Sequence, residues 1–226
     1  MKKQKIEITQ GSVLKKVNQD YCVSIDNLAA VFDGCGSGEH SEIGAKRMGE
    51  AIRKNSGNIV SSQNLMMTIY STFNDIILED LPDEEFWNKY LFTMIVCIEK
   101  DDSFEVYNAG DGYIIAIDNY DKIMYIKINN NILVANGNAP QYIAYNYMIG
   151  RLHRKYSRLE EKIFPKLDYQ SVYVATDGLR FILSDRFPKQ ERKAFEKALI
   201  DRDEQSIREI LKRNSKMIYD DIAIAL

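Results

Sequence analysis

Short apolar runs rich in β-branched and aromatic residues recur along the whole chain, and they constrain its fold more than any other feature of the sequence. Between residues 90 and 128, such runs are separated only by turn-forming groups such as Asp-Asp and Gly-Asp-Gly. This spacing predicts an antiparallel meander. The predicted strands are 21–25 and 28–33, which the turn pair Asp26-Asn27 separates, and then 90–98, 104–107, 113–117, 123–128, 171–176 and 222–226.

Apolar residues at helical spacing lie between these strands. Ile43, Met48 and Ile52 recur in one segment, and the same spacing predicts helices over 65–76, 191–200 and 207–212. Residues 129–140 carry loop signals, and a Tyr-rich stretch predicts a further helix over 142–159. No linker or repeat divides the chain, so we expect a single domain over residues 1–226. The order of elements favours an α+β fold, a four-layer α-β-β-α sandwich with two central, mainly antiparallel sheets flanked by helices.

Charge and cysteine content exclude several classes of protein. Thirty basic residues balance 33 acidic ones, and the net charge of -3 leaves no global field to attract nucleic acid. No apolar run approaches the ~18 residues of a membrane span, and the charged N-terminus lacks the apolar core of a signal peptide. Cys22, Cys35 and Cys97 form no C-x-x-C pair, which argues against a disulfide framework or a structural zinc site. We therefore expect a cytoplasmic protein that binds neither nucleic acid nor a membrane.

Three of the apolar runs end in Asp-Gly, at Asp33-Gly34, Asp111-Gly112 and Asp177-Gly178. The end of a strand holds a side chain rigidly at the sheet edge, and the following glycine permits a tight turn with its carbonyl open to a ligand. Clustered carboxylates repel one another unless a cation neutralises them, and sets of oxygen ligands suit Mg²⁺ or Mn²⁺. A single Asp-Gly after a strand is also a common hairpin turn, so each motif alone has a structural explanation.

Two more acidic motifs complete the pattern. Asp20 follows Asn18-Gln19 just before the first predicted strand, and Asp220-Asp221 precede the last one. Taken in order, the five motifs resemble those of the metal-dependent protein phosphatases of type 2C, in the small bacterial form that is little more than the catalytic domain. The opening motif of that family, a basic residue followed by Asn-Gln-Asp, is similar to residues 15–20, and its Asp-Gly loop motif is similar to residues 33–39.

This resemblance implies both a metal site and a reaction. It implies two Mn²⁺ or Mg²⁺ ions bridged by Asp33, and a third ion that is bound more weakly. The implied ligands of the first two ions are Asp20, Asp33, the Gly34 carbonyl, Asp177 and Asp220. Asp111 is the implied ligand at the third site. The phosphate-binding arginine of the family falls on Lys15, which lacks a bidentate guanidinium fork. The implied reaction is hydrolysis of phosphoserine or phosphothreonine by direct attack of a water or hydroxide that bridges the two ions. The implied partner is a phosphorylated protein, the substrate of an opposing serine/threonine kinase, and the expected state is a monomer.

Other readings of the sequence fit less well. No cysteine is followed by arginine six residues later, which excludes the Cys-x5-Arg phosphatases, and Glu39 stands where a dinucleotide-binding loop requires glycine. Gly112-Tyr113 replaces the Ser-Arg of many relatives.

The basic run 151–158 predicts a solvated helix face or a docking site for an acidic phosphoprotein. The alternative from another class is a weak or inactive pseudophosphatase that acts as a phosphoprotein-binding regulatory module, although the presence of every implied carboxylate favours activity.

Overall fold

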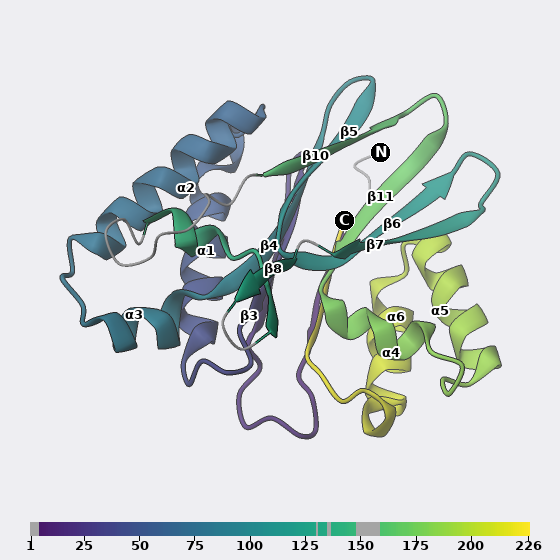
Figure 1. The fold of residues 1–226 in the computed structure, drawn as a ribbon. Helices are drawn as coiled ribbons and strands as arrows, with labels where there is room; N and C mark the ends of the chain where they lie inside the picture. Colours follow the sequence, from purple (N-terminus) through teal and green to yellow (C-terminus); the bar gives the residue numbers. More distant parts are fainter. Residues whose placement is uncertain (1–4, 130, 135–136, 148–158) are drawn as a thin grey trace.

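The computed structural model describes residues 5–129, 131–134, 137–147 and 159–226. These residues form four layers, in the order helices, sheet, sheet and helices (Figure 1). Every strand pairing within the two large sheets is antiparallel. The prediction of an α+β sandwich with two central antiparallel sheets is confirmed.

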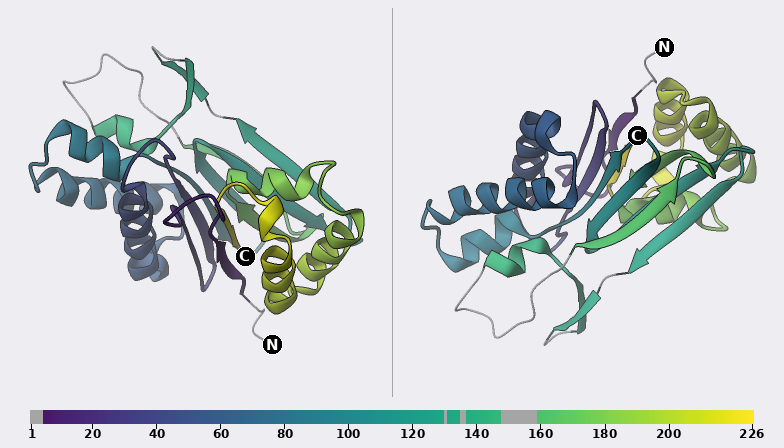
Figure 2. Two further views of the ribbon diagram at one scale, coloured as in Figure 1. Left: turned by 90° about the horizontal axis from the view of Figure 1, so that it is seen from below. Right: turned by 90° about the horizontal axis from the view of Figure 1, so that it is seen from above.

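Among the described residues, three hairpins between successive strands lie in the two large sheets, two in the first and one in the second, and the other pairings join strands that are farther apart in the chain. The prediction of one meander over 90–128 is wrong, because the hairpin 92–109 belongs to one sheet and the hairpin 111–129 to the other. The first sheet has the order β10-β5-β4-β3-β2, and the second has the order β1-β12-β11-β6-β7. The strands of the first sheet are β2 (Asp20–Ile25), β3 (Leu28–Gly34), β4 (Phe92–Glu99), β5 (Ser103–Ala109) and β10 (Glu160–Pro165). Those of the second are β1 (Glu7–Gln10), β6 (Asp111–Asp118), β7 (Ile123–Asn129), β11 (Tyr169–Ala175) and β12 (Ile222–Ala225). A separate hairpin of β8 (Asn131–Val134) and β9 (Gly137–Pro140) extends beyond the layers (Figure 2).

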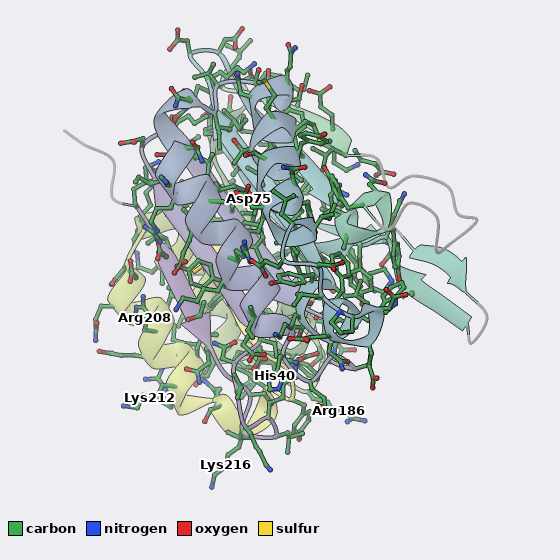
Figure 3. The ribbon with its side chains drawn as sticks, turned by 90° about the vertical axis from the view of Figure 1, so that its left-hand side faces the viewer. His40, Asp75, Arg186, Arg208, Lys212 and Lys216 are labelled. Carbon is green, nitrogen blue, oxygen red and sulfur yellow. The ribbon has the colours of Figure 1, made fainter. Side chains whose placement is uncertain are left out.

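Helices cover the outer face of each sheet (Figure 1). The first sheet carries α1 (Ser41–Asn55), α2 (Ser62–Ile77) and α3 (Asp83–Tyr90), and the second carries α4 (Arg180–Leu183), α5 (Lys189–Asp201) and α6 (Glu204–Arg213). Short 3-10 turns are η1 (Ser56–Asn58), η2 (Ile143–Tyr147), η3 (Asp177–Leu179) and η4 (Ser215–Met217). Polar side chains such as Asp75 of α2 and Lys212 of α6 lie on the outward faces (Figure 3), and α2 also exposes Met67 and Tyr70. Among the described residues, no helix combines the length and the apolar character that a membrane crossing requires.

Three hydrophobic cores hold the layers together. Met48 of α1 and Phe73 of α2 pack with Phe32 of β3 in the core between the first helices and sheet. Phe195 of α5 and Tyr173 of β11 belong to the corresponding core on the other side. The central core between the two sheets contains many small side chains, among them Cys22, Ala29, Ala116, Ala223 and Ala225. Because β3 is buried along nearly its whole length, it is fixed from both faces up to the point where Asp33 emerges.

The structure differs from the predicted elements in several places. Tyr90, predicted to begin a strand, is instead the last residue of α3, and β4 starts at Phe92. The helix α3 was not predicted, because only Phe86 and Tyr90 are buried on it and so short a helix shows little periodicity. The loop signals over 129–140 belong to the β8–β9 hairpin, and 160–165 form β10. Of the helix predicted over 142–159, the described part is the 3-10 turn η2, while residues 148–158, and with them the basic run, lie outside the described residues.

Candidate functional site

The residues that the sequence singles out come together at one cleft of about 240 Å³. Its lining includes Lys15, Asp33, Gly34, Asp111, Asp177 and Asp220, six of the seven predicted site residues. The seventh, Asp20, lies next to Asp33 because the two residues are partners in the β2–β3 register. Six further residues complete the lining: Cys35, Gly36, Thr93, Pro140, Tyr142 and Arg180. The cleft forms where the ends of strands from both sheets meet, so residues from opposite ends of the chain share it.

Asp20 is a buried carboxylate with one oxygen left without a partner. Its Oδ2 accepts a hydrogen bond of 2.6 Å from the hydroxyl of Thr176, which follows β11 in the other sheet. Its Oδ1 is buried and has no hydrogen-bond donor among the described residues. A buried carboxylate oxygen without a donor is costly, so this atom is suited to a cation.

Burial raises the pKa of Asp33 well above its ordinary value, and the negative charges of Asp20, Asp220 and Asp111 raise it further. Burial is also the main cause of the raised pKa of Asp20, although the Thr176 hydroxyl acts in the opposite direction. Four carboxylates therefore influence one another around Asp33, and they cannot all be ionised without positive charge nearby. Oxygen donors alone, with an unpartnered buried oxygen among them, fit Mg²⁺ or Mn²⁺.

Asp111 is held at the start of β6 between two glycines in left-handed backbone conformations. Gly110 has φ +94° and Gly112 has φ +141°, and a side chain at either position would be strained. A Cβ at Gly112 would also lie 2.8 Å from the carbonyl oxygen of Ala175. The backbone conformation and the close Ala175 carbonyl explain why glycine stands at position 112, where many relatives have serine. Tyr113, at the position of the arginine in those relatives, is buried in the core beneath α4 to α6.

The guanidinium of Arg180 contacts the carboxylates of both Asp177 and Asp220. One nitrogen of Arg180 contacts Oδ2 of Asp177, and the other lies 2.7 Å from Oδ2 of Asp220. Asp177 opens η3 directly after β11, whereas Asp220 lies just before β12. Their approach depends on Gly178, because a Cβ there would lie 1.9 Å from the Asp221 carbonyl oxygen.

Lys15 lies in the same cleft and is anchored by both residues of the Asp220-Asp221 pair. Its Nζ is 2.6 Å from Oδ1 of Asp220 and 3.2 Å from Oδ2 of Asp221. Burial alone would lower the pKa of Lys15, but the two carboxylates outweigh it and raise the value to about 12. Lys15 is therefore a permanent positive charge at the position implied for phosphate binding.

Asp221 has a different role from its neighbour Asp220. Its carboxylate is buried and accepts backbone N–H groups from the loop that carries Lys15: Ser12 at 2.7 Å and Gln19 at 2.9 Å. The Gln19 carbonyl in turn accepts the Gly34 N–H at 3.2 Å, and a Cβ at Gly34 would lie 2.9 Å from that carbonyl oxygen. Asp221 thus ties the first motif to the last one.

Asp177 and Asp220 are paired with cations, and the carboxylates of the cleft do not form a ready-made coordination sphere. Among the described residues, no group of three His, Cys, Asp and Glu side chains is arranged closely enough to hold one ion. Lys15 and Arg180 instead supply the positive charge next to Asp220. The structure brings the predicted residues to one place, and their role as metal ligands stays a prediction.

The structure places four residues at the site to which the sequence motifs assign no role there: Arg180, Thr176, Pro140 and Tyr142. Arg180 lies three residues after Asp177, one turn along from the carboxylate it contacts, and that spacing could have indicated the pair. Thr176 directly precedes Asp177 in the motif that resembles Ser-Asp-Gly, but the sequence assigns it no role of its own at the site. Pro140 and Tyr142 follow the loop signals of 129–140, where no motif was present to indicate that they line the cleft.

The architecture is similar to that of several bacterial serine/threonine phosphatases of known structure. Serine/threonine phosphatase PstP/Ppp of Mycobacterium tuberculosis matches with a TM-score of 0.66 at 13% identity, over 98% of this chain and 96% of that one. Stp1 of Staphylococcus aureus matches with a TM-score of 0.65 at 16% identity, over 98% and 93%. The catalytic domain of PstP in complex with two manganese ions gives 0.68 at 12% identity, over 98% and 96%. At such low identity these likenesses show the fold.

The family follows from the sequence itself. A sequence model of protein phosphatase 2C matches residues 13–214, which span all the motifs from Lys15 to Asp177. The chain belongs to the protein phosphatase 2C family. No curated protein matches the sequence.

Proposed function

We propose that the protein is a metal-dependent phosphoprotein phosphatase that hydrolyses phosphoserine and phosphothreonine by direct attack of water. The observation that carries this proposal is the convergence of Lys15, Asp33, Asp111, Asp177 and Asp220 on one cleft in a member of the protein phosphatase 2C family. Residues 1–226 would act as one catalytic domain, because both sheets contribute to that cleft.

Two Mn²⁺ or Mg²⁺ ions would be held by the carboxylates around Asp33. Asp20 and Asp33 come from the first sheet, Asp177 and Asp220 from the second, and the Gly34 carbonyl is a further oxygen donor; Asp111 would belong to a weaker third site. Support for two ions comes from the PstP structure with two manganese ions. When bound, such ions supply activation of the attacking water and neutralisation of phosphoryl charge. The central position of Asp33 among the other carboxylates suits it to contact both ions.

The residues of the chain itself would bind and orient the phosphoryl group. Lys15 presents a fixed ammonium to the cleft, and Asp221 holds the loop of Lys15 through the Ser12 and Gln19 N–H groups. A positive group fixed in advance stabilises the charge of the transferring phosphoryl group without reorganisation during the reaction. No side chain needs to form a covalent phosphoenzyme in this scheme.

The substrate would be a phosphorylated protein that a serine/threonine kinase modifies, and we propose that the enzyme acts as a cytoplasmic monomer. The second candidate function is a pseudophosphatase that binds phosphoproteins without hydrolysing them. One observation favours it, since Arg180 engages the two carboxylates that a metal ion would need.

A hydrolysis assay separates the two functions. Purified protein is given a phosphothreonine peptide at neutral pH with Mn²⁺, with Mg²⁺ or with EDTA, and Asp177→Asn serves as the control. If the protein is a phosphatase, phosphate release should depend on the metal and should fall to background in Asp177→Asn. Binding of the phosphopeptide with no release under any of these conditions would favour the pseudophosphatase.

A further inference from the structure

Arg180 lies in the candidate site without a role in the proposed reaction. It is the first residue of α4, and its guanidinium contacts Asp177 and lies 2.7 Å from Oδ2 of Asp220. One side chain of the protein thus joins two carboxylates that the proposed function assigns to a metal ion.

Asp220 would not keep both of its present partners if it bound a divalent ion. Its Oδ1 is 2.6 Å from the Lys15 ammonium, and its Oδ2 is 2.7 Å from the Arg180 guanidinium. A divalent ion on either oxygen would lie within a few ångströms of a positive group. Like charges at such distances repel strongly in a partly buried cleft, so one of the two cations would move away.

Arg180 is the cation with more freedom to move. Lys15 has a second anchor in Asp221, whose carboxylate is itself fixed by backbone N–H groups. Both carboxylate partners of Arg180 are assigned to metal ions, so its remaining contact among the described residues would be the Phe181 ring, whose centroid lies 4.9 Å from the guanidinium carbon. The Arg180 side chain is 43% exposed, against 25% for Lys15. Its backbone stays in place, because the neighbouring Ile182 is buried in the core between the second sheet and α4 to α6. A displaced guanidinium would therefore remain at the mouth of the cleft.

A guanidinium at this place would supply what Lys15 lacks. Its planar fork matches two phosphoryl oxygens at once, whereas an ammonium acts as a point charge. Because Lys15 and Arg180 approach the two oxygens of one carboxylate, both cations face the same small part of the cleft.

We propose that Arg180 exchanges between two partners: the carboxylates of Asp177 and Asp220 in the metal-free protein, and the phosphoryl oxygens of the substrate once divalent ions hold those carboxylates. This inference rests on the proposed function and adds a substrate-binding residue to it. Metal binding would then both assemble the catalytic centre and release the cation that recognises the phosphoryl group.

The first test is calorimetric titration of the metal-free protein with Mn²⁺ alone. Arg180→Gln removes the charge, and Arg213→Gln is the matched control, because Arg213 also pairs with a carboxylate, that of Glu191, but on the surface of α6. Metal entry into the wild type breaks two partly exposed ion pairs, so Arg180→Gln should bind Mn²⁺ about tenfold more tightly. Arg213→Gln should bind as the wild type does. Unchanged or weaker binding by Arg180→Gln would overturn the exchange.

The second test uses inorganic phosphate as the probe on the Mn²⁺-saturated proteins. Loss of the guanidinium should weaken phosphate binding about tenfold in Arg180→Gln. Arg180→Lys, which keeps the charge without the fork, should bind phosphate with intermediate affinity and Mn²⁺ within about threefold of the wild type. Equal phosphate affinity in wild type and Arg180→Gln would overturn the substrate contact. Neither titration requires hydrolysis. A wild-type protein without phosphatase activity would refute the proposed function, and the two titrations would still decide the role of Arg180.

Discussion

Replacing Asp221 by alanine should destabilise the protein far more than the same change at its neighbour Asp220. The Asp221 carboxylate is almost fully buried and accepts the Ser12 and Gln19 N–H groups at 2.7 and 2.9 Å. A hydrogen bond to a charged group contributes roughly 1.5–3 kcal/mol, so the loss of two amounts to about 3–6 kcal/mol. Asp220 is partly exposed and its long-range partners are the side chains of Lys15 and Arg180, so Asp220→Ala should cost only about 1 kcal/mol.

Urea unfolding in EDTA, followed by circular dichroism, measures both values by linear extrapolation. If Asp221→Ala does not fold, Asp221→Asn keeps one of the two acceptors and should lose about half as much stability. A loss below about 1 kcal/mol in Asp221→Ala, or an equal loss in Asp220→Ala, would refute the assignment of Asp221 as the residue that ties the loop of Lys15 to β12.

Three further predictions concern the supports of the site. Gly178→Ala should destabilise the fold and abolish Mn²⁺ binding, because its Cβ would lie 1.9 Å from the Asp221 carbonyl oxygen; unaltered thermal melting would contradict this. Thr176→Val removes the hydroxyl between Asp20 and the Ala223 N–H and should cost about 1–3 kcal/mol, whereas Thr176→Ser should stay close to wild type in the same urea experiment. Folding raises the pKa of Asp20, so over part of the pH range the native metal-free protein holds a proton that the unfolded chain releases. The free energy of unfolding of the wild type, relative to that of Asp20→Asn, should therefore fall as the pH rises from about 4 towards neutrality. Parallel curves for the two proteins across that range would show that Asp20 does not titrate in this way.

Much of the fold could be predicted because local patterns and final structure agree. The strands that lead to Asp33 and Asp177 contain continuous apolar runs, 28–32 in β3 and 172–175 in β11, and burial on both faces is what such runs indicate. The short helix α3 could not be predicted, since only Phe86 and Tyr90 are buried on it. The β8–β9 hairpin could not be predicted because the Asn and Gly turn signals of that segment outweigh its short apolar run.

The carboxylates of the site could also be found from sequence, because strand ends and glycines mark their positions. What the sequence did not reveal is which charges meet. The contacts of Arg180 with Asp220 and of Asp221 with Ser12 join residues 40 and 209 positions apart. The pairing of β12 with β11 and with β1 in the second sheet brings these groups together, and no local pattern encodes it.

The proposed function depends on a centre for two divalent ions that the carboxylates around Asp33 would form. Equilibrium dialysis of the purified protein against Mn²⁺ tests it directly, with Asp33→Asn as the variant and the fold checked by circular dichroism. We expect two tightly held ions per wild-type chain and the loss of at least one in Asp33→Asn, because Asp33 is proposed to contact both ions. No bound Mn²⁺ in the wild type, or the same stoichiometry and affinity in both proteins, would contradict it.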